Sequence, residues 1–313
     1  MTMARMPAAE IDVSVDLVTR LLQAQHPELS DRPLEVAANG WDNVMLRLGD
    51  DLAVRVPRRE AAVLVEHEQL VLPRLAPRLP VPVPVPVRVG RPTAFYPWAW
   101  SVVPWLPGEA AFRQPAGARD PLAADLADVL AALHVPADPD APRNPVRGEP
   151  LADRADIVRA RIDAADPTGR LRARYDEDAA APRHPGPPLW IHGDLHPFNM
   201  LADDSGLRAL IDFGDVTACD PATDLATAWL TFTLAGRDDF IARYTAATGA
   251  DAATWSRARA WASRLTSSLL TASDDHPELA ALGRFAFEQV VGSPSLDPRT
   301  DSGRPRDTPA PRA

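Results

Sequence analysis

Two short segments of the chain contain the residue types that phosphoryl transfer requires. Asp194 and Asn199 stand five positions apart in Ile191-His-Gly-Asp-Leu-His-Pro-Phe-Asn, which is the D-x-x-x-x-N spacing of a phosphoryl-transfer loop. Asp212 follows an apolar run and begins the sequence Asp-Phe-Gly-Asp. This reaction needs a carboxylate near the attacking hydroxyl group and oxygen ligands that hold Mg²⁺ against the phosphates. The two segments therefore predict transfer of a nucleotide γ-phosphoryl group to a hydroxyl group.

The longer motifs around these residues resemble the aminoglycoside phosphotransferase family. They are His192-Gly-Asp-Leu-His-Pro-Phe-Asn, Ile211-Asp-Phe-Gly-Asp and Asp220-Pro-Ala-Thr-Asp-Leu-Ala. The family consists of small-molecule kinases, macrolide kinases among them, with a protein-kinase-like fold. The resemblance covers about residues 35–290. It implies an α+β fold of two lobes, with a small antiparallel-sheet N-terminal lobe and a larger, mostly helical C-terminal lobe.

The resemblance also implies a role for each residue of these motifs. Asp194 would be the catalytic base, and Asn199 and Asp212 would be the ligands of Mg²⁺. His192 would be the structural histidine at the start of the loop, and Asp224 would support the loop from the start of a helix. The implied cofactors are Mg²⁺ and a purine nucleotide, either ATP or GTP.

The N-terminal part of the chain matches this family less closely. Arg55 stands where the family usually has a strand lysine, and its planar fork could bind two phosphate oxygens. Its expected partner on the following helix is Glu68, with Glu66 as the alternative, although Arg55 could also be a solvated strand residue. A full glycine-rich loop is absent. We expect the backbone from Gly40 to Asn43 to lie over the phosphates, with Asn43 ordering the turn.

The segment Val102-Val-Pro-Trp-Leu-Pro-Gly resembles the hinge that binds the nucleotide base. Val103 and Trp105 are the expected contacts. Because proline has no N–H group, Pro104 can offer only its carbonyl oxygen. The hydrogen-bond donor to the base would therefore be the N–H of Trp105.

Two kinds of element must position these residues. In the N-terminal third, apolar spacing predicts helices at 11–25 and 59–75, and two alternating runs over 44–56 predict a hairpin that turns near Gly49. Further along, short buried strands are expected at 189–191 and 207–211, on either side of the catalytic loop. The other expected helices are at 121–134, 151–164, 221–234, 237–247, 251–272 and 276–290.

The proline pattern marks a connector and a boundary. Alternate residues of the run Leu79-Pro-Val-Pro-Val-Pro-Val-Pro-Val lack an N–H group, so this run predicts an extended connector and not an interior strand. We place the lobe boundary at Pro107-Gly108. The expected units are residues 1–107 for the nucleotide, 108–298 for the catalytic loop and the acceptor pocket, and 299–313 as a disordered tail.

The charge of the chain bears on its partners. The net charge is −10, and every one of the 33 basic residues is an arginine. Residues 108–298 hold 18 arginines and 29 acidic residues, a net charge of −11. This balance argues against nucleic acid, which requires a basic surface, and favours a hydroxyl-bearing cationic small molecule such as an aminoglycoside. Asp215 and Asp220 are the candidate contacts for its ammonium groups, although each could equally be a solvated surface residue.

Other acceptors and other functions stay open. Four aromatic residues on the expected C-terminal helices could line an apolar pocket for a macrolide, although such spacing is more often that of a core; they are Trp229, Phe232, Trp255 and Trp261. The acceptor could also be a metabolite. His192 and His196 have the spacing of zinc ligands in a hydrolase, but Gly193 and Pro197 argue against the helix that this site needs. The arginine at position 55 keeps a nucleotide-binding pseudokinase as a further alternative.

Cysteine usage and apolar patterning bear on the compartment. Cys219 is the only cysteine, which excludes an internal disulfide and a cysteine-rich zinc site, so we expect it to be structural. No apolar stretch reaches the roughly 18 residues that a membrane span needs, and the N-terminal residues lack the apolar core of a signal peptide. These features predict a cytoplasmic protein without membrane contact.

Overall fold

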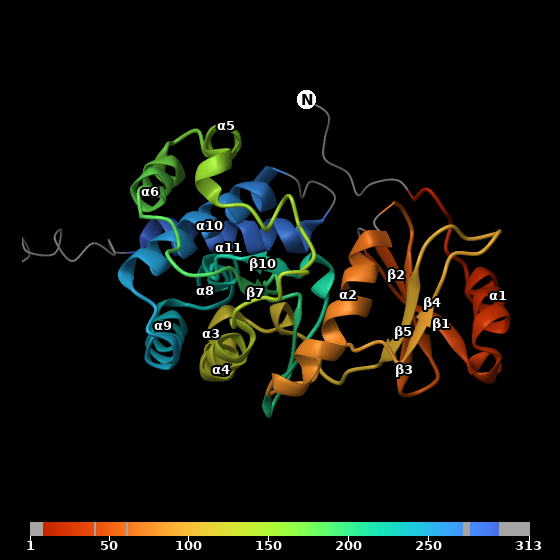
Figure 1. Ribbon diagram of the computed structural model, residues 1–313. Coiled ribbons are helices and arrows are strands. Elements are labelled where there is room, and N and C mark those ends of the chain that lie inside the picture. The colour runs from red at the N-terminus through yellow and green to blue at the C-terminus, as the bar shows by residue number, and fades with distance from the viewer. Residues whose placement is uncertain (1–8, 41, 61, 272–275, 294–313) are drawn as a thin grey trace, which may run out of the picture.

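The computed structural model describes residues 9–40, 42–60, 62–271 and 276–293. The expected disordered tail, 299–313, lies outside these residues. Figure 1 shows an antiparallel sheet with one helix on each face at one end of the molecule and a larger helical lobe at the other. The two-lobe α+β fold expected from the sequence is confirmed. No helix among the described residues is long and apolar enough to cross a membrane.

The N-terminal sheet has five strands in the order β1-β2-β3-β5-β4, and every neighbouring pair is antiparallel. The strands are β1 (Leu34–Asn39), β2 (Asn43–Leu48), β3 (Leu52–Pro57), β4 (Arg88–Gly90) and β5 (Trp100–Pro104). The predicted hairpin is β2–β3, and its turn contains Gly49 at a φ of 64°. The strands β1 and β4 were not predicted. Both lie at an edge of the sheet and are largely exposed, so their sequences carry little alternation.

Two helices cover the faces of this sheet. Helix α1 (Val15–Gln25) begins at Ser14, whose side chain accepts a hydrogen bond from the Leu17 N–H group, and its apolar side packs on the strands. Helix α2 (Ala62–Leu75) lies on the opposite face (Figure 1) and begins three residues later than the predicted start. Its C-terminal residues, Leu72 and Leu75, belong to the hydrophobic core of the larger lobe. Helix α2 therefore lies against the N-terminal sheet and ends in the core of the larger lobe.

The proline run forms an extended connector, as expected, with no strand before β4. Val83 in the middle of the run is buried in the core of the larger lobe. The Leu210 N–H group donates to the Pro82 carbonyl at 3.2 Å. The chain thus returns from α2 along the larger lobe before it re-enters the N-terminal sheet at β4.

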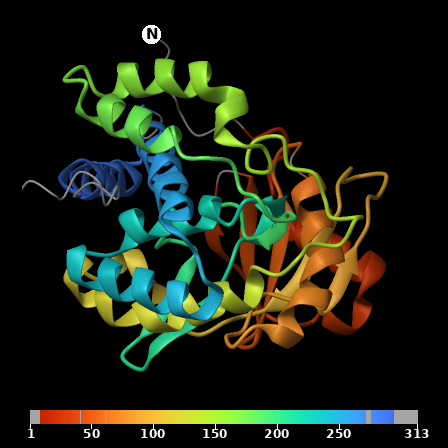
Figure 2. The same ribbon diagram turned by 60° about the vertical axis from the view of Figure 1, so that its left-hand side comes forward.

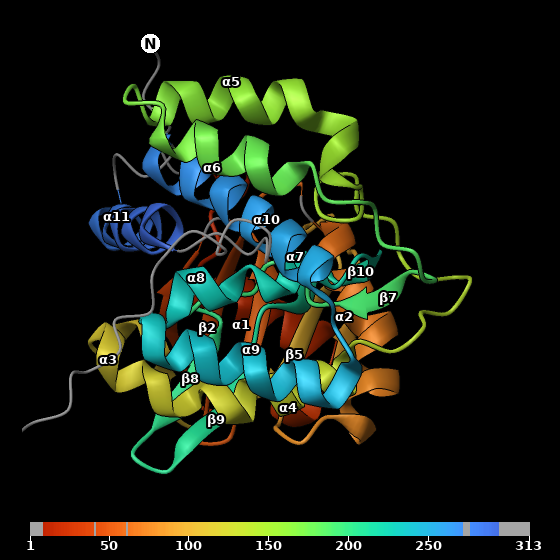
Figure 3. The ribbon, with the colours of Figure 1, turned by 90° about the vertical axis from the view of Figure 1, so that its left-hand side faces the viewer.

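The larger lobe is built around α10, which packs against α5, α6, α7 and α11. In Figure 3, α4 and α9 lie side by side, and α5 and α6 lie on the opposite side of α10. The helices are α3 (Ala116–Arg119), α4 (Ala123–Leu133), α5 (Ala155–Ala165), α6 (Arg170–Ala179), α7 (Ala222–Leu225), α8 (Thr227–Thr231), α9 (Leu234–Thr248), α10 (Ala252–Thr271) and α11 (Pro277–Gly292).

Three parts of this lobe differ from expectation. The four-residue α3 was not predicted. The mostly polar α6 was not predicted either, because it buries only Leu171, Tyr175 and Asp178. The single helix expected over 221–234 is split into α7 and α8. It cannot continue into α9, because Thr233 is extended and its N–H group donates to Asp120 at 2.9 Å.

Two small sheets hold the segments that carry the predicted chemistry. Strand β7 (Leu189–Ile191) pairs with β10 (Thr217–Cys219), and β8 (Met200–Asp203) pairs with both β6 (Glu109–Ala110) and β9 (Gly206–Leu210). The strands predicted at 189–191 and 207–211 are therefore present. The catalytic loop connects β7 to β8, and Asp212 follows β9. Figure 2 shows these short strands in green between the N-terminal sheet and the helices.

Candidate active site

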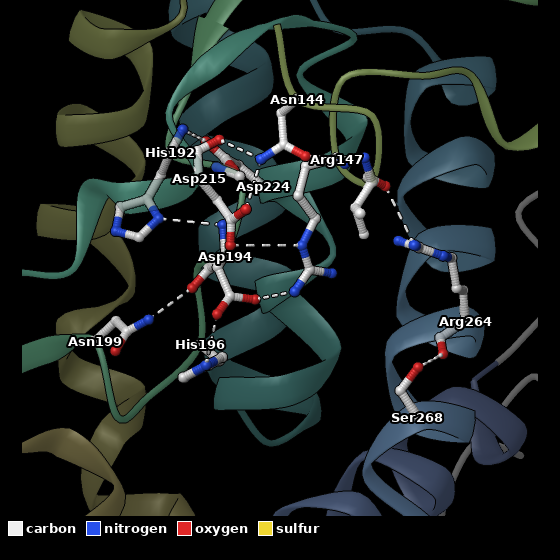
Figure 4. Close-up of polar contacts among 12 residues, drawn as sticks. Asn144, Arg147, His192, Asp194, His196, Asn199, Asp215, Asp224, Arg264 and Ser268 are labelled. Carbon is white, nitrogen blue, oxygen red and sulfur yellow. Dashed lines mark hydrogen bonds and ion pairs between the residues drawn. The ribbon is translucent and has the colours of Figure 1, made fainter. Parts of the chain in front are cut away.

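One buried carboxylate fixes the start of the catalytic loop. Asp224 on α7 has no exposed surface. Its two oxygens accept hydrogen bonds from the backbone N–H groups of His192, at 2.7 Å, and Gly193, at 2.8 Å. The support that the resemblance implied for Asp224 is thus present in the structure (Figure 4).

His192 connects the two catalytic segments through both nitrogens of its ring. Its Nε2 lies 2.9 Å from the Ile211 carbonyl oxygen, and its Nδ1 accepts the Asp194 N–H group at 3.2 Å. Because both nitrogens are engaged, His192 has no lone pair left for zinc. Within the described ranges no group of three or more His, Cys, Asp or Glu residues could hold a metal ion, which argues against the hydrolase alternative.

A second histidine, which no sequence motif indicates, completes this buried network. His134 follows α4, and its Nε2 lies 3.1 Å from Asp224 while its Nδ1 lies 2.7 Å from the Tyr244 hydroxyl group. It is 90 positions from Asp224 in the sequence, and no motif joins the two. Its position at the end of an apolar helix was the only available signal.

The candidate catalytic base, Asp194, is held by two cationic or polarisable neighbours. The Arg147 guanidinium forms an ion pair with Oδ1 through Nη2, and His196 Nε2 lies 3.4 Å from Oδ2 (Figure 4). Burial alone would raise the pKa of Asp194, but Arg147 and His196 more than offset it and hold this pKa well below its usual range. Asp194 is therefore a carboxylate at neutral pH. Arg147 was not predicted, because it comes from a proline-interrupted loop without a motif.

The two acidic residues predicted to bind the acceptor have different surroundings. Asp215 lies next to Asp194 and accepts a hydrogen bond from Asn144 at 2.5 Å, with Arg147 Nε 4.0 Å away. Burial and the charge of Asp194 raise its pKa. Asp220 instead accepts from Arg257 Nε at 2.6 Å, and both side chains are mostly buried. Asp220 is thus engaged in the interior of the lobe, which argues against the acceptor role that we predicted for it.

The two candidate ligands of Mg²⁺ are oriented by their neighbours. Asn199 donates through Nδ2 to the Asp194 carbonyl at 2.8 Å, which leaves its amide oxygen without a donor among the described residues. Asp212 follows β9 in the left-handed region, with a φ of 63°, and 49% of its side chain is exposed. Carboxylate and amide oxygens are the ligands that Mg²⁺ prefers, so this pair fits the ion chemically.

Arg55 lies between two carboxylates. Its Nη1 is 3.0 Å from Glu68 on α2, and its Nη2 donates to Asp212 at 2.7 Å. The side chain is buried, which excludes the alternative of a solvated strand arginine, whereas Glu66 is exposed. Burial raises the pKa of Glu68 to about 7, against the opposing effect of Arg55. The Arg55 Nε atom is buried without a hydrogen-bond partner, so it is a donor that a phosphate oxygen could satisfy.

The turn expected over the phosphates is closed by the backbone. The Gly40 N–H group donates to the Asn43 carbonyl at 2.8 Å. The Asn43 side-chain oxygen is buried and has no partner among the described residues, so no hydrogen bond to this oxygen supports our expectation that the side chain orders the turn. Trp41 lies outside the described residues. Asp42 pairs with Arg59 at 3.0 Å, and burial raises its pKa.

At the predicted hinge, the expected hydrogen-bond donor to the nucleotide base is already used by another group. Val103 is buried in β5 and pairs with Ala53 of β3. The N–H group of Trp105 donates to the Asp51 carbonyl at 2.8 Å, and the indole ring of Trp105 lies 4.8 Å from the Arg47 guanidinium carbon. The Trp105 N–H group is therefore already engaged by the β2–β3 hairpin. The expectation that it binds the base is not supported in this conformation.

The aromatic residues considered for a macrolide pocket form the core instead. Trp229, Phe232, Trp255 and Trp261 are all buried in the core of the larger lobe. Only Trp261 also borders a cavity, of about 320 Å³, between α10 and the segments 148–152 and 181–188. Cys219 borders the same cavity, and burial raises the pKa of its thiol to about 11, in line with a structural role.

Comparisons with known proteins agree with this architecture. The structure is similar to wild-type aminoglycoside 2′-phosphotransferase IIIa in complex with GDP, with a TM-score of 0.65, 19% identity, and coverage of 90% of this chain and 99% of the other. It is also similar to a macrolide 2′-phosphotransferase of Brachybacterium faecium, with a TM-score of 0.59, 21% identity and coverage of 87% and 98%. A third similar structure is the streptomycin–ATP complex of aminoglycoside 2″-phosphotransferase IIa, with a TM-score of 0.58, 16% identity and coverage of 90% and 99%.

The sequence itself supports the same relationship. None of the curated protein sequences matches this chain significantly. The profile of the phosphotransferase enzyme family, however, matches residues 33–261, which include both catalytic segments and most of the two lobes. The chain belongs to the phosphotransferase enzyme family.

Proposed function

We propose that this protein transfers the γ-phosphoryl group of a purine nucleoside triphosphate to a hydroxyl group of a small molecule. The observation that carries the proposal is the placement of Asp194, Asn199 and Asp212 on two adjacent loops. His192 and Asp224 hold these loops together through buried hydrogen bonds. A protein that only binds nucleotide has no chemical reason to keep a partly buried, ionised carboxylate at position 194.

The proposed nucleotide site lies between the N-terminal sheet and the catalytic loops. Arg55 would bind phosphate oxygens, oriented by Glu68, and Asn199 and Asp212 would hold Mg²⁺. When bound, Mg²⁺ neutralises the charge of the phosphates. Because Arg55 already connects Glu68 to Asp212, the phosphate-binding residue and a metal ligand are positioned together. The backbone of the turn after Gly40 would cover the phosphates.

The proposed role of Asp194 is to orient the acceptor. Its carboxylate accepts the hydrogen bond of the attacking hydroxyl group, whose oxygen forms a bond to the γ-phosphorus while the bond to the leaving nucleoside diphosphate breaks. The hydroxyl proton passes to Asp194 late in the reaction and from there to solvent. A carboxylate with a strongly lowered pKa suits alignment better than early proton removal.

The acceptor class is open to direct measurement. The acidic balance of the larger lobe, −11 over residues 108–298, supports an aminoglycoside, as do the aminoglycosides bound by similar enzymes. Near the catalytic loop, however, Asp215 is bonded to Asn144, and Asp220 is engaged by Arg257. A macrolide has less support, since three of the four aromatic residues considered for it lie in the core away from the cavity.

The first test is consumption of ATP and of GTP with Mg²⁺ across aminoglycosides, macrolides and sugar alcohols. Stimulation of turnover by one acceptor class is the expected result. Asp194→Asn should reduce this turnover roughly a hundredfold to ten-thousandfold, while nucleotide affinity stays within about twofold. Asp163→Asn, which changes an exposed carboxylate paired with Arg172, serves as the control. Near-normal turnover in Asp194→Asn would refute the assignment. Tight nucleotide binding without turnover of any acceptor would favour the pseudokinase alternative.

A further inference from the structure

A buried arginine without a carboxylate partner among the described residues contacts the loop that carries Val146 and Arg147. Arg264 on α10 is 7% exposed, and its guanidinium carbon lies 4.6 Å from the centre of the Trp261 ring. Its Nη2 donates to the Val146 carbonyl at 3.2 Å, while Nη1 is buried and has no hydrogen-bond partner. Among the described residues, no carboxylate lies within ion-pair distance of it. The protein therefore buries a positive charge with an unused donor.

Neighbouring residues make this region positive. Burial and the charges of Arg147, Arg161 and Arg154 together lower the pKa of Arg264 to about 9, against the opposing effect of Asp194. By contrast, Arg259, which is buried on the same helix, forms two hydrogen bonds of 2.7 Å with Asp178. The interior of the lobe thus neutralises that arginine directly, whereas among the described residues Arg264 has no carboxylate in ion-pair contact.

Arg147 brings this positive region to the catalytic base. Figure 4 shows the Arg264 side chain pointing from α10 toward the loop that carries Val146 and Arg147. The Arg147 guanidinium is paired with Asp194 Oδ1, and its Nε, 4.0 Å from Asp215, is buried without a hydrogen-bond partner. An acceptor hydroxyl group must reach this same Asp194 carboxylate. A group of the acceptor that comes to lie beside Arg264 therefore meets a positive charge, which repels an ammonium group at that position although the lobe as a whole is acidic.

We infer that the acceptor carries an anionic group, a carboxylate or a phosphate, near the hydroxyl group that is phosphorylated, and that Arg264 and Arg147 bind this group. The inference rests on the proposed phosphotransferase function. The anion would satisfy Arg264 Nη1 and would draw Arg147 away from Asp194. Oδ1 of Asp194 then becomes available to the hydroxyl group. The anionic group of the acceptor thus contributes to binding and also releases the Asp194 carboxylate from Arg147.

Three polyols that differ only in charge test this inference. D-Gluconate, D-sorbitol and D-glucamine share the same chain of hydroxyl groups and carry a carboxylate, no charge and an ammonium group. Sorbitol 6-phosphate separates a phosphate ligand from a carboxylate. Affinity is measured calorimetrically with Mg²⁺ and ADP at saturation, so that the nucleotide site is already filled. We expect one of the two anions to bind roughly tenfold or more tightly than sorbitol, and glucamine to bind most weakly.

Two matched variants test whether Arg264 causes the preference for an anion. Arg264→Gln should reduce the anion preference to about twofold or less and leave sorbitol affinity unchanged. Arg237→Gln is the control, because Arg237 is also buried, also lies over a tryptophan ring, and bonds to the uncharged Gln289 far from Asp194. If Arg264→Gln does not fold, the charge series on the wild-type protein still decides the question.

The outcomes separate this inference from the proposed function. Equal affinity for all the polyols, tightest binding of glucamine, no binding of either anion, or an unchanged preference in Arg264→Gln would each overturn the inference. If the protein still binds Mg²⁺ and nucleotide and phosphorylates a cationic or neutral acceptor, the proposed function stands and only the inference of an anionic acceptor fails. Loss of nucleotide turnover with every acceptor would instead reject the proposed function itself.

Discussion

At Asp194, burial and charge act in opposite directions on one carboxyl group. Burial favours the neutral form, whereas Arg147 and His196 favour the carboxylate and prevail. Since the pKa in the folded protein lies below that in the unfolded chain, the ion pair stabilises the fold above the ordinary aspartate pKa. This stabilisation is lost as the pH falls through the lowered value. Arg147 therefore helps to keep the Asp194 carboxylate ionised over the whole physiological range.

Replacing Arg147 tests this balance. In Arg147→Ala, we expect the pKa of Asp194 to rise toward or above the ordinary range, because burial then acts with less opposition. An NMR titration of the Asp194 carboxyl carbon measures the change. Arg183→Ala, which removes an exposed ion pair with Asp153, should leave the titration unchanged. An Asp194 pKa that stays equally low in Arg147→Ala would show that Arg147 is not its cause.

Residues in contiguous motifs were predictable, and residues recruited from elsewhere were not. Asp194, Asn199 and Asp212 lie within about 20 positions of one another. The motif of one loop and the motif that follows one strand are therefore enough to identify them. Arg147 and His134 reach the site from loops whose positions depend on the packing of the entire lobe. No local pattern encodes such contacts.

One difference at the residue scale has a clear physical origin. The role expected of the Trp105 N–H group assumed that this group is free. In the structure, the β2–β3 hairpin engages it. Local sequence does not reveal which backbone groups a neighbouring turn will use.

At the scale of elements, the segment from β7 into the catalytic loop depends on close backbone approach. Gly193 has a φ of 88°, which disfavours any side chain, and a Cβ atom there would overlap the Asp215 carbonyl oxygen. The turn thus places the loop directly against the segment after Asp-Phe-Gly. The glycine is visible in the sequence, but this close approach becomes evident only in the fold.

Substitution of Gly193 separates backbone strain from this steric overlap. Gly169 at the start of α6 has a similar φ of 76° but no atom within 4 Å of its Cβ position. Gly169→Ala should therefore lower the free energy of unfolding by about 1 kcal/mol and leave turnover unchanged. Gly193→Ala should cost more and strongly reduce turnover, because Asp194 and Asp215 must move. Urea unfolding and steady-state kinetics measure both, and equal effects of the two substitutions would contradict the prediction.

Element prediction succeeded where an apolar pattern was strong. The hairpin β2–β3 and the long helices α4, α9, α10 and α11 were found with small shifts of their ends. The edge strand β1 and the polar helix α6 were missed, because most of their side chains face solvent. Helix α6 depends instead on Tyr175 and on the ion pair of Asp178 with Arg259, which are tertiary interactions.

At the scale of the whole molecule, nucleotide binding should stabilise both lobes together. Arg55 comes from the N-terminal sheet, while Asp212 belongs to the larger lobe, so the proposed site spans the two cores. At a nucleotide concentration one hundred times its dissociation constant, the stabilisation would be about 2.7 kcal/mol. We expect this effect to require Mg²⁺ and to appear as a single thermal transition.

Asp212→Asn should remove most of the Mg²⁺-dependent part of this stabilisation. Asp203→Asn, which alters an exposed carboxylate on β8, is the control and should retain it. Thermal unfolding with and without Mg²⁺ at fixed nucleotide concentration measures the difference. Full Mg²⁺-dependent stabilisation in Asp212→Asn would remove Asp212 from the metal site.

The proline connector has a consequence for how the lobes move. The chain passes between the two cores at the end of α2, again where the proline run leaves Pro82 and Val83 for β4, and a third time after β5. Three separate connections, one of them a stiff proline run, restrict sliding and twisting of the sheet against the larger lobe more than a single flexible linker would. We therefore expect product nucleotide to leave through a restricted opening between the lobes.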